Sequence, residues 1–145
     1  IDYNPHLDQI LISAPGMGEV WIIDHSNNSD VTADSAGDLM YRWGNPAAYD
    51  RGTLNDTKLF WQHDAHWVRD HAPDSGKIMI FNNRYGGNYS AIVMIDPPKN
   101  ADSTYMMGAD TTYLPADFDS MWTATNPTDF FSSFISGFDH QEFYW

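Results

Sequence analysis

The sequence feature that most constrains the fold is an internal repeat of short β-strand patterns. Residues 20–24 and 92–96 are apolar runs that both end in Asp. After a polar loop, each is followed by a run that contains Met beside an aromatic residue and ends in Asn-Pro, at residues 38–46 and 119–127. No long stretch has the 3.6-residue periodicity of a helix. The sequence therefore predicts an all-β protein in which one supersecondary unit occurs twice.

Short apolar runs separated by Pro, Gly, Asn and Asp predict the positions of the strands. The expected strands are residues 9–13, 19–24, 38–43, 59–68, 77–81, 90–96, 103–107, 120–124 and 129–135. A long loop rich in Ser, Asn and Asp is expected at residues 25–37.

The repeated unit has the strand content of a β-propeller blade, which is about 40 to 45 residues long. The prediction is a β-propeller fragment of two to three blades within one domain, residues 1–145. The approximate units are residues 9–58 and 59–128, with the start of a further unit at 129–145. A β-sandwich with coincidental similarity between its strands is the alternative.

The length of the chain indicates an incomplete ring. It has 145 residues, whereas a closed ring of four such blades needs about 160 or more. An open arc of blades leaves sheet edges with unpaired backbone groups. We therefore expect a piece of a longer protein, whose edges are covered by missing blades or by other chains.

The composition excludes several classes of partner and chemistry. Twenty acidic residues against seven basic ones give a formal net charge of −13, which repels nucleic acids and anionic membranes. No apolar run is long enough for a transmembrane helix, so membrane insertion is not expected. The absence of Cys excludes disulfides, thiol catalysis and Cys-bound zinc. An acidic chain rich in Asn, Asp and Ser favours an extracellular setting.

A cluster of polar and aromatic residues at 59–67 is the first candidate site. Neutral imidazole is a good nucleophile, so His63 is a candidate nucleophile or acid–base group, with Asp64 or an acid from another blade as the group that fixes its tautomer. In a regular strand His63 and His66 point to opposite faces, which argues against a shared metal ion, and no metal is predicted. The alternative is that both imidazoles make structural hydrogen bonds.

The end of the next predicted strand is the second candidate site. Asn82, Asn83 and Arg84 follow one another there, and they offer amide donors and a guanidinium group. These groups suit an oxyanion such as sulfate or carboxylate. Because Asn also tolerates turn geometry, a turn without a ligand is the alternative.

Taken together and in order, several motifs resemble the arylsulfotransferase (arylsulfate sulfotransferase) family. The resemblance is carried by residues 2–5, 19–26, 38–46, 62–67, 80–83, 88–90 and 130–137. It implies a six-bladed β-propeller that is exported to the periplasm or the extracellular space. It also implies transfer of a sulfuryl group from a phenolic sulfate ester to a phenol through a sulfohistidine, without a cofactor.

The resemblance also assigns roles to individual residues. The family's Gln-His-Thr/Asp-Ala pattern falls on residues 62–65, so His63 matches the histidine that becomes sulfurylated. His66, Arg84, Asn82 and Asn83 are the expected substrate-binding residues. Arg84 stands where the family's Phe-Asp-Asn-Gly pattern has Gly.

Two other functions remain open from the sequence. One is a non-catalytic extracellular β-propeller that serves as a binding or assembly module. The other is a metal-dependent hydrolase that uses His63, His66 and His71 as ligands.

Overall fold

The computed structural model of the protein describes residues 1–26 and 37–138. Within these ranges the regular structure consists of β-strands and short 3₁₀ helices, which confirms the all-β prediction. The strands are β1 (Asp2–Asn4), β2 (Gln9–Ala14), β3 (Glu19–Asp24), β4 (Leu39–Trp43), β5 (His63–Trp67), β6 (Ile78–Asn82), β7 (Ala91–Ile95) and β8 (Ser120–Trp122). The 3₁₀ helices are η1 (Pro15–Met17), η2 (Pro46–Tyr49), η3 (Leu54–Asp56) and η4 (Pro127–Asp129).

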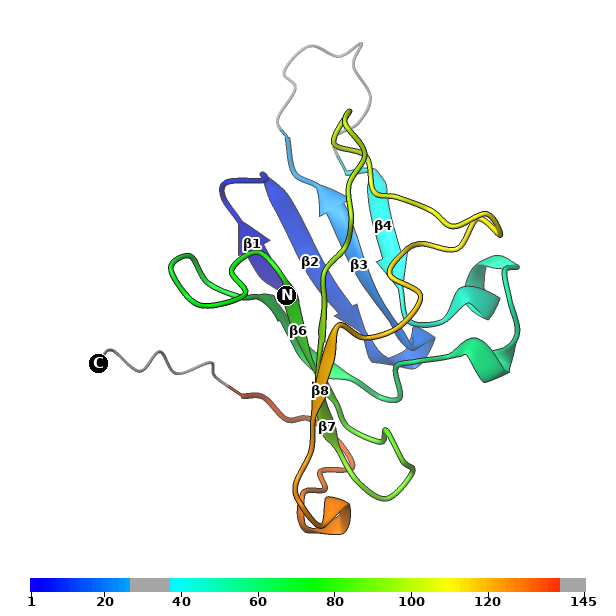
Figure 1. Ribbon diagram of the computed structural model, residues 1–145, viewed down its shortest axis with the longest axis vertical. Coiled ribbons are helices and arrows are strands. Elements are labelled where there is room, and N and C mark those ends of the chain that lie inside the picture. Colours follow the sequence, from blue (N-terminus) through cyan, green and yellow to red (C-terminus); the bar gives the residue numbers. More distant parts are fainter. Residues whose placement is uncertain (27–36, 139–145) are drawn as a thin grey trace.

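The strands form two four-stranded antiparallel sheets (Figure 1). Their strand orders are β1-β2-β3-β4 and β5-β6-β7-β8, so every strand pairs with its neighbour in sequence. Neither sheet closes on itself. Two open sheets do not by themselves define a β-propeller, so the propeller remains a prediction.

The internal repeat of the sequence has a counterpart in the structure. β3 and β7 are the third strands of their sheets, and β4 and β8 are the fourth. The two Asn-Pro pairs that follow also match, because Pro46 and Pro127 are the first residues of η2 and η4. The repeated sequence therefore marks equivalent positions in two similar sheets.

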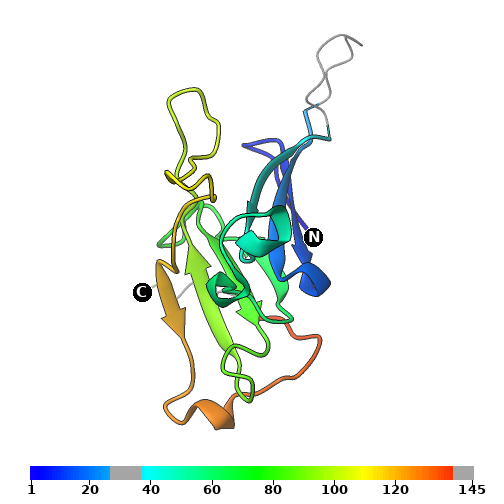
Figure 2. The same ribbon diagram turned by 90° about the vertical axis from the view of Figure 1, so that its right-hand side faces the viewer.

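The core lies between the two sheets, which pack against each other (Figure 2). Side chains from alternate strand positions point into it, as expected for a two-residue period. The fully buried members include Leu11, Val20, Ile22 and Tyr41 from the first sheet and Ile78, Ile80, Val93 and Ile95 from the second. β6 is buried along its whole length, because the first sheet covers one face and residues 130–138 contact the other.

The start of the second sheet is attached to the first sheet by polar contacts. β5 lies against β1 and β2. The backbone N–H of Trp67 donates to Asp2 Oδ2 over 3.0 Å, and Ser13 Oγ donates to the carbonyl of Gln62 over 3.2 Å. These bonds fix the strand that carries His63 relative to the first sheet.

Three of the predicted strands differ from the structure. The run at 59–68 becomes a strand only from His63 onwards, and the run at 129–135 contains the end of η4 followed by irregular backbone. Residues 103–107 form only isolated bridges, because Tyr105 and Tyr113 pack on Tyr41 and hold their segment over β4.

One strand is not predicted at all, and parts of two predicted segments cannot be compared. β1 is a strand only through its pairing with β2, where Tyr3 lies opposite Ile10. Residues 27–36 of the predicted loop and 139–145 of the last predicted unit lie outside the described residues. In the described part of the chain, no helix has the length and apolarity needed to span a bilayer.

Candidate active site

His63 is the first residue of β5, and two strained residues flank it. Trp61 has a φ of 54° and Asp64 a φ of 48°, both in the left-handed region. Residues other than Gly reach this region at a cost of about 1 to 3 kcal/mol, and such strain gathers at functional sites. The strain is hardest to explain by local preference at Trp61, because an indole side chain gains nothing from this conformation. Seven other non-Gly residues of the described chain also have a positive φ, so this segment is one of several with such backbone geometry.

A β-bulge in β5 brings His63 and His66 to the same face. His63 lies opposite Phe81 and His66 opposite Met79, so three steps along β5 match two steps along β6. The extra residue lies at the left-handed Asp64, and it turns His66 back to the face of His63. The expectation that the two imidazoles point to opposite faces is wrong, because it assumed a regular strand.

The imidazole of His63 is held at one nitrogen only. Its Nδ1 lies 2.9 Å from Asn83 Oδ1 and 2.9 Å from the carbonyl oxygen of Trp61. Both of these oxygens are acceptors, so Nδ1 carries the hydrogen when the ring is neutral. No hydrogen bond joins Nε2 to another described residue. The half-buried ring thus keeps the lone pair of Nε2 available.

Arg84 belongs to the same cluster of side chains as His63. Its guanidinium carbon lies 5.2 Å from the ring centroid of Trp61, and its Nε donates to the carbonyl of Ser133 over 2.9 Å. Phe134 meets the imidazole of His63 edge-on, with 5.5 Å between centroids, and lies 6.4 Å from Trp61. The terminal nitrogens of Arg84 make no hydrogen bond to the described residues, so they are free to bind an anion.

Asn82 and Asn83 are buried completely and bind neighbouring segments. Asn82 Oδ1 accepts from the N–H of Phe60, and its Nδ2 donates to the carbonyl of Lys58, each over 2.8 Å. Asn83 binds His63 and, through Nδ2, the carbonyl of Ser132. Neither amide reaches the surface, so neither can contact a substrate unless the site rearranges.

His66 lies in a different environment from His63. Its Nδ1 is 3.7 Å from Asp64 Oδ1, and its ring centroid is 4.8 Å from that of Phe138. His66 and Asp64 line a cavity of about 230 Å³ together with Arg69 and Asp2. The polar side chains of this cavity come from β5, from the residues just after it and from β1.

The described residues do not assemble the metal site that the hydrolase alternative needs. They include no group of three or more His, Cys, Asp or Glu side chains that could hold a metal ion. His71 is exposed and lies beyond the end of β5.

Sequence reasoning missed the part played by residues 130–138. Phe130 contacts Phe81, Phe134 contacts His63, and Phe138 contacts both His66 and Phe81. The three Phe residues recur at every fourth position, and this spacing was the available signal. The segment runs past the end of the second sheet after η4, in orange and red in Figure 1.

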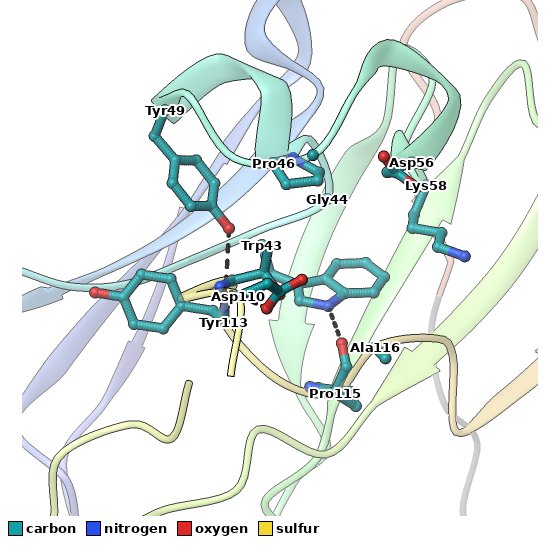
Figure 3. A pocket seen from close by; sticks show the side chains of 12 residues that line it. Trp43, Gly44, Pro46, Tyr49, Asp56, Lys58, Asp110, Tyr113, Pro115 and Ala116 are labelled. Atoms are coloured by element: carbon teal, nitrogen blue, oxygen red, sulfur yellow. Dashed lines mark hydrogen bonds between the residues drawn. The ribbon is translucent and has the colours of Figure 1, made fainter. Parts of the chain in front are cut away.

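A second cavity, of about 240 Å³, lies at the end of β4 (Figure 3). Trp43 lines it and donates from Nε1 to the carbonyl of Pro115 over 2.7 Å, while the N–H of Tyr113 approaches the hydroxyl of Tyr49. The cavity also contains Asp56 and Asp110. None of the predicted site residues lines it.

The two carboxylates of this second cavity stabilise their own loops. Hydrogen bonds from Thr53 lower the pKa of Asp56, and hydrogen bonds from Thr112 lower the pKa of Asp110. Each pKa lies below the usual 3.8, so both groups are ionised near neutral pH. Their bonds account for the local turns.

No family model, curated protein or solved structure matches the chain. The resemblance to the arylsulfotransferases therefore rests on the motifs and their order. The geometry around His63 is a separate observation, which does not depend on that resemblance.

Proposed function

We propose that the chain is part of an arylsulfotransferase-like protein in which His63 accepts a sulfuryl group from an aryl sulfate and passes it to a phenol. The hydrogen bonding of the His63 imidazole supports the proposal. Its Nδ1 is held by two acceptors, whereas its Nε2 has no partner among the described residues. A nucleophilic histidine needs this arrangement, and the family resemblance supplies the class of reaction.

The reaction runs in two displacements at sulfur. The lone pair of His63 Nε2 attacks sulfur, an N–S bond forms, and the S–O bond breaks as the phenolate leaves with its electron pair. The oxygen of the acceptor phenol then attacks sulfur, the N–S electron pair returns to Nε2, and the acceptor's proton passes to water. While sulfur is bound the ring is cationic, and the two oxygens at Nδ1 stabilise that charge.

The neighbouring side chains fit the substrate groups. Arg84 has free terminal nitrogens for sulfuryl oxygens, which a guanidinium binds as charged hydrogen-bond acceptors. Trp61 and Phe134 are 45% and 53% exposed, and their rings offer apolar walls for an aryl group. His66 shares the face of His63 and is assigned to substrate binding. Asn82 and Asn83 are assigned to the support of the site, since both are buried.

We propose the same architecture that the resemblance implies, a fragment of a six-bladed β-propeller at the periplasmic or extracellular side. Two consecutive four-stranded meanders, with β5 lying against β1 and β2, are compatible with neighbouring blades. In such a ring the exposed sheet edges are covered by missing blades or by other chains.

Turnover by matched histidine variants tests the proposed reaction. The chain is incubated with 4-nitrophenyl sulfate and phenol, and release of nitrophenolate is followed by absorbance. We expect His63→Gln to lose at least about a hundredfold in rate, because no other group replaces the nucleophile. His25→Gln, at an exposed histidine bonded to Asp8, is the matched control and should keep full activity. Equal rates for the His63→Gln variant and the unaltered chain would exclude the mechanism.

The second candidate function is a non-catalytic binding or assembly module. The exposure of β8 favours this function. β8 is the last strand of the second sheet, and all three of its residues are exposed. Met121 and Trp122 are among them, so the strand offers a partner apolar surface and an edge that no other described strand pairs with.

A further inference from the structure

We propose that Asn83 is a positioning residue that holds His63 in the tautomer with hydrogen on Nδ1, so that Nε2 keeps its lone pair. The use of this tautomer in catalysis rests on the proposed function, whereas the tautomer itself does not. The family resemblance places Asn83 with the substrate, and the sequence pattern indicates either an oxyanion site or a turn, so neither assigns this role.

The orientation of the Asn83 amide follows from its second partner. Asn83 is fully buried, and its Nδ2 lies 3.0 Å from the carbonyl oxygen of Ser132. A carbonyl only accepts hydrogen bonds, so the NH₂ group must face Ser132 and the amide oxygen must face His63. An amide oxygen also only accepts, so the nitrogen of His63 that meets it must donate. The hydrogen of the neutral ring is thereby assigned to Nδ1.

A buried hydroxyl locks this orientation. Ser90 Oγ donates to the backbone carbonyl of Asn83 over 2.7 Å and accepts from the N–H of Ser132 over 2.9 Å. Ser90 is also fully buried. The backbones of Asn83 and Ser132 are therefore tied together on either side of the amide. A turn of the amide would set its oxygen against the carbonyl oxygen of Ser132, and two buried acceptors that face each other without a hydrogen are strongly disfavoured.

The arrangement couples the site to a distant part of the chain. Ser132 lies in the segment whose Phe134 packs on His63, so one segment both orients the amide and covers the ring. The carbonyl of Trp61 is the other acceptor at Nδ1, and its position depends on the left-handed backbone of that residue. Without Asn83 a single acceptor remains, and a histidine that is less firmly held exchanges between its two tautomers.

Nitrogen NMR of the histidine rings tests the inference directly. The ¹⁵N-labelled 145-residue chain is recorded at a pH where the rings are neutral, and each ring nitrogen shows whether it carries hydrogen. We expect His63 to have a protonated Nδ1 and an unprotonated Nε2. Asn83→Ala should convert this pattern into a mixture of both tautomers. Asn88→Ala, at an exposed turn position, is the matched control and should leave the pattern unchanged.

A second variant covers the case in which Asn83→Ala fails to fold. Ser90→Ala keeps the amide but removes the hydroxyl that locks it, and we expect a smaller shift towards the mixture. His25 is an internal reference in every spectrum, because its Nδ1 binds Asp8 and not Asn83. A protonated Nε2 on His63 in the unaltered chain, or an unchanged pattern in a folded Asn83→Ala variant, would overturn the inference.

The NMR pattern tests the role of Asn83, and sulfuryl transfer tests the proposed function, so the two can fail separately. If the tautomer pattern is as expected but the chain transfers no sulfuryl group, the reaction fails and the positioning role stands. If transfer occurs, the Asn83→Ala variant should lose several-fold in kcat with little change in KM, because Asn83 acts on the nucleophile and does not contact the substrate. Transfer with an unchanged kcat in that variant would refute the positioning role alone.

Discussion

At the scale of the residue, adjacent side chains in the site divide between chemistry and support. His63 and Arg84 each keep a polar nitrogen without a hydrogen bond to the described residues, whereas Asn82 and Asn83 use their amides to hold other segments. Burial explains the division, because a buried amide finds its hydrogen-bond partners within the protein and not in solvent. An exposed guanidinium on an indole face is under no such constraint.

The supporting role of Asn82 predicts a loss of stability. Asn82→Ala leaves the N–H of Phe60 and the carbonyl of Lys58 without partners, and we expect a loss of about 2 kcal/mol in the free energy of unfolding. Asn88→Ala, at an exposed position, should change it by less than about 0.5 kcal/mol. Urea denaturation compares the two variants, and similar midpoints for both would contradict the role given to Asn82.

At the scale of the element, the ends of the strands depend on close backbone approaches. Gly44, directly after β4, has a φ of 122°. A Cβ at this position would lie 2.5 Å from the carbonyl oxygen of Gly18 and 2.7 Å from a side-chain carbon of Leu59. The path from the first sheet to the segment that carries His63 therefore requires Gly here.

Gly44→Ala should thus destabilise the fold by about 3 kcal/mol or more, through both the clash and the unfavourable backbone angle. Gly16→Ala is the matched control, since a Cβ there meets nothing within 4 Å and its φ is not positive. We expect that variant to unfold within about 0.5 kcal/mol of the unaltered chain. Equal losses for the two variants in thermal or urea unfolding would argue against the close approach.

The strands differ in how well the sequence predicts their positions. β2, β3, β6 and β7 lie within a residue or two of their predicted positions, because short runs rich in Ile, Val and Met define strands by their local pattern. The polar β1 gains strand structure only from pairing with β2, which no local pattern reveals.

The site, like the strands, is predicted only as far as its local sequence patterns reach. Its candidate nucleophile can be recognised from the sequence, because the motif around His63 is local. The bulge at Asp64 depends on the register against β6, and the covering Phe134 comes from a segment about 70 residues away, so neither is visible in a local pattern. Asn83 shows the limit most clearly, since its partner Ser132 decides which way its amide points.

At the scale of the whole molecule, two sheets share one core, and β8 is an edge strand whose outer side pairs with no strand of residues 1–26 and 37–138. This strand carries Met121 and Trp122 on its surface. An exposed strand of this kind favours association with another chain.

We therefore expect the isolated chain to associate as its concentration rises, and sedimentation velocity measures this. Met121→Lys places a charge on β8 and should shift the distribution towards monomer. Met17→Lys is the matched control, because Met17 is similarly exposed but lies on η1. A chain that stays monomeric at all concentrations, or an equal effect of both variants, would contradict association through β8.

Mass spectrometry of His63 after reaction with an aryl sulfate tests the proposed sulfohistidine intermediate. The chain is mixed with 4-nitrophenyl sulfate, quenched without an acceptor, digested and mapped by mass spectrometry. We expect an addition of about 80 Da, the mass of SO₃, on the peptide that contains residues 62–65 and on His63 within it. Turnover that proceeds with His63 unmodified, or with the addition on another residue, would contradict it.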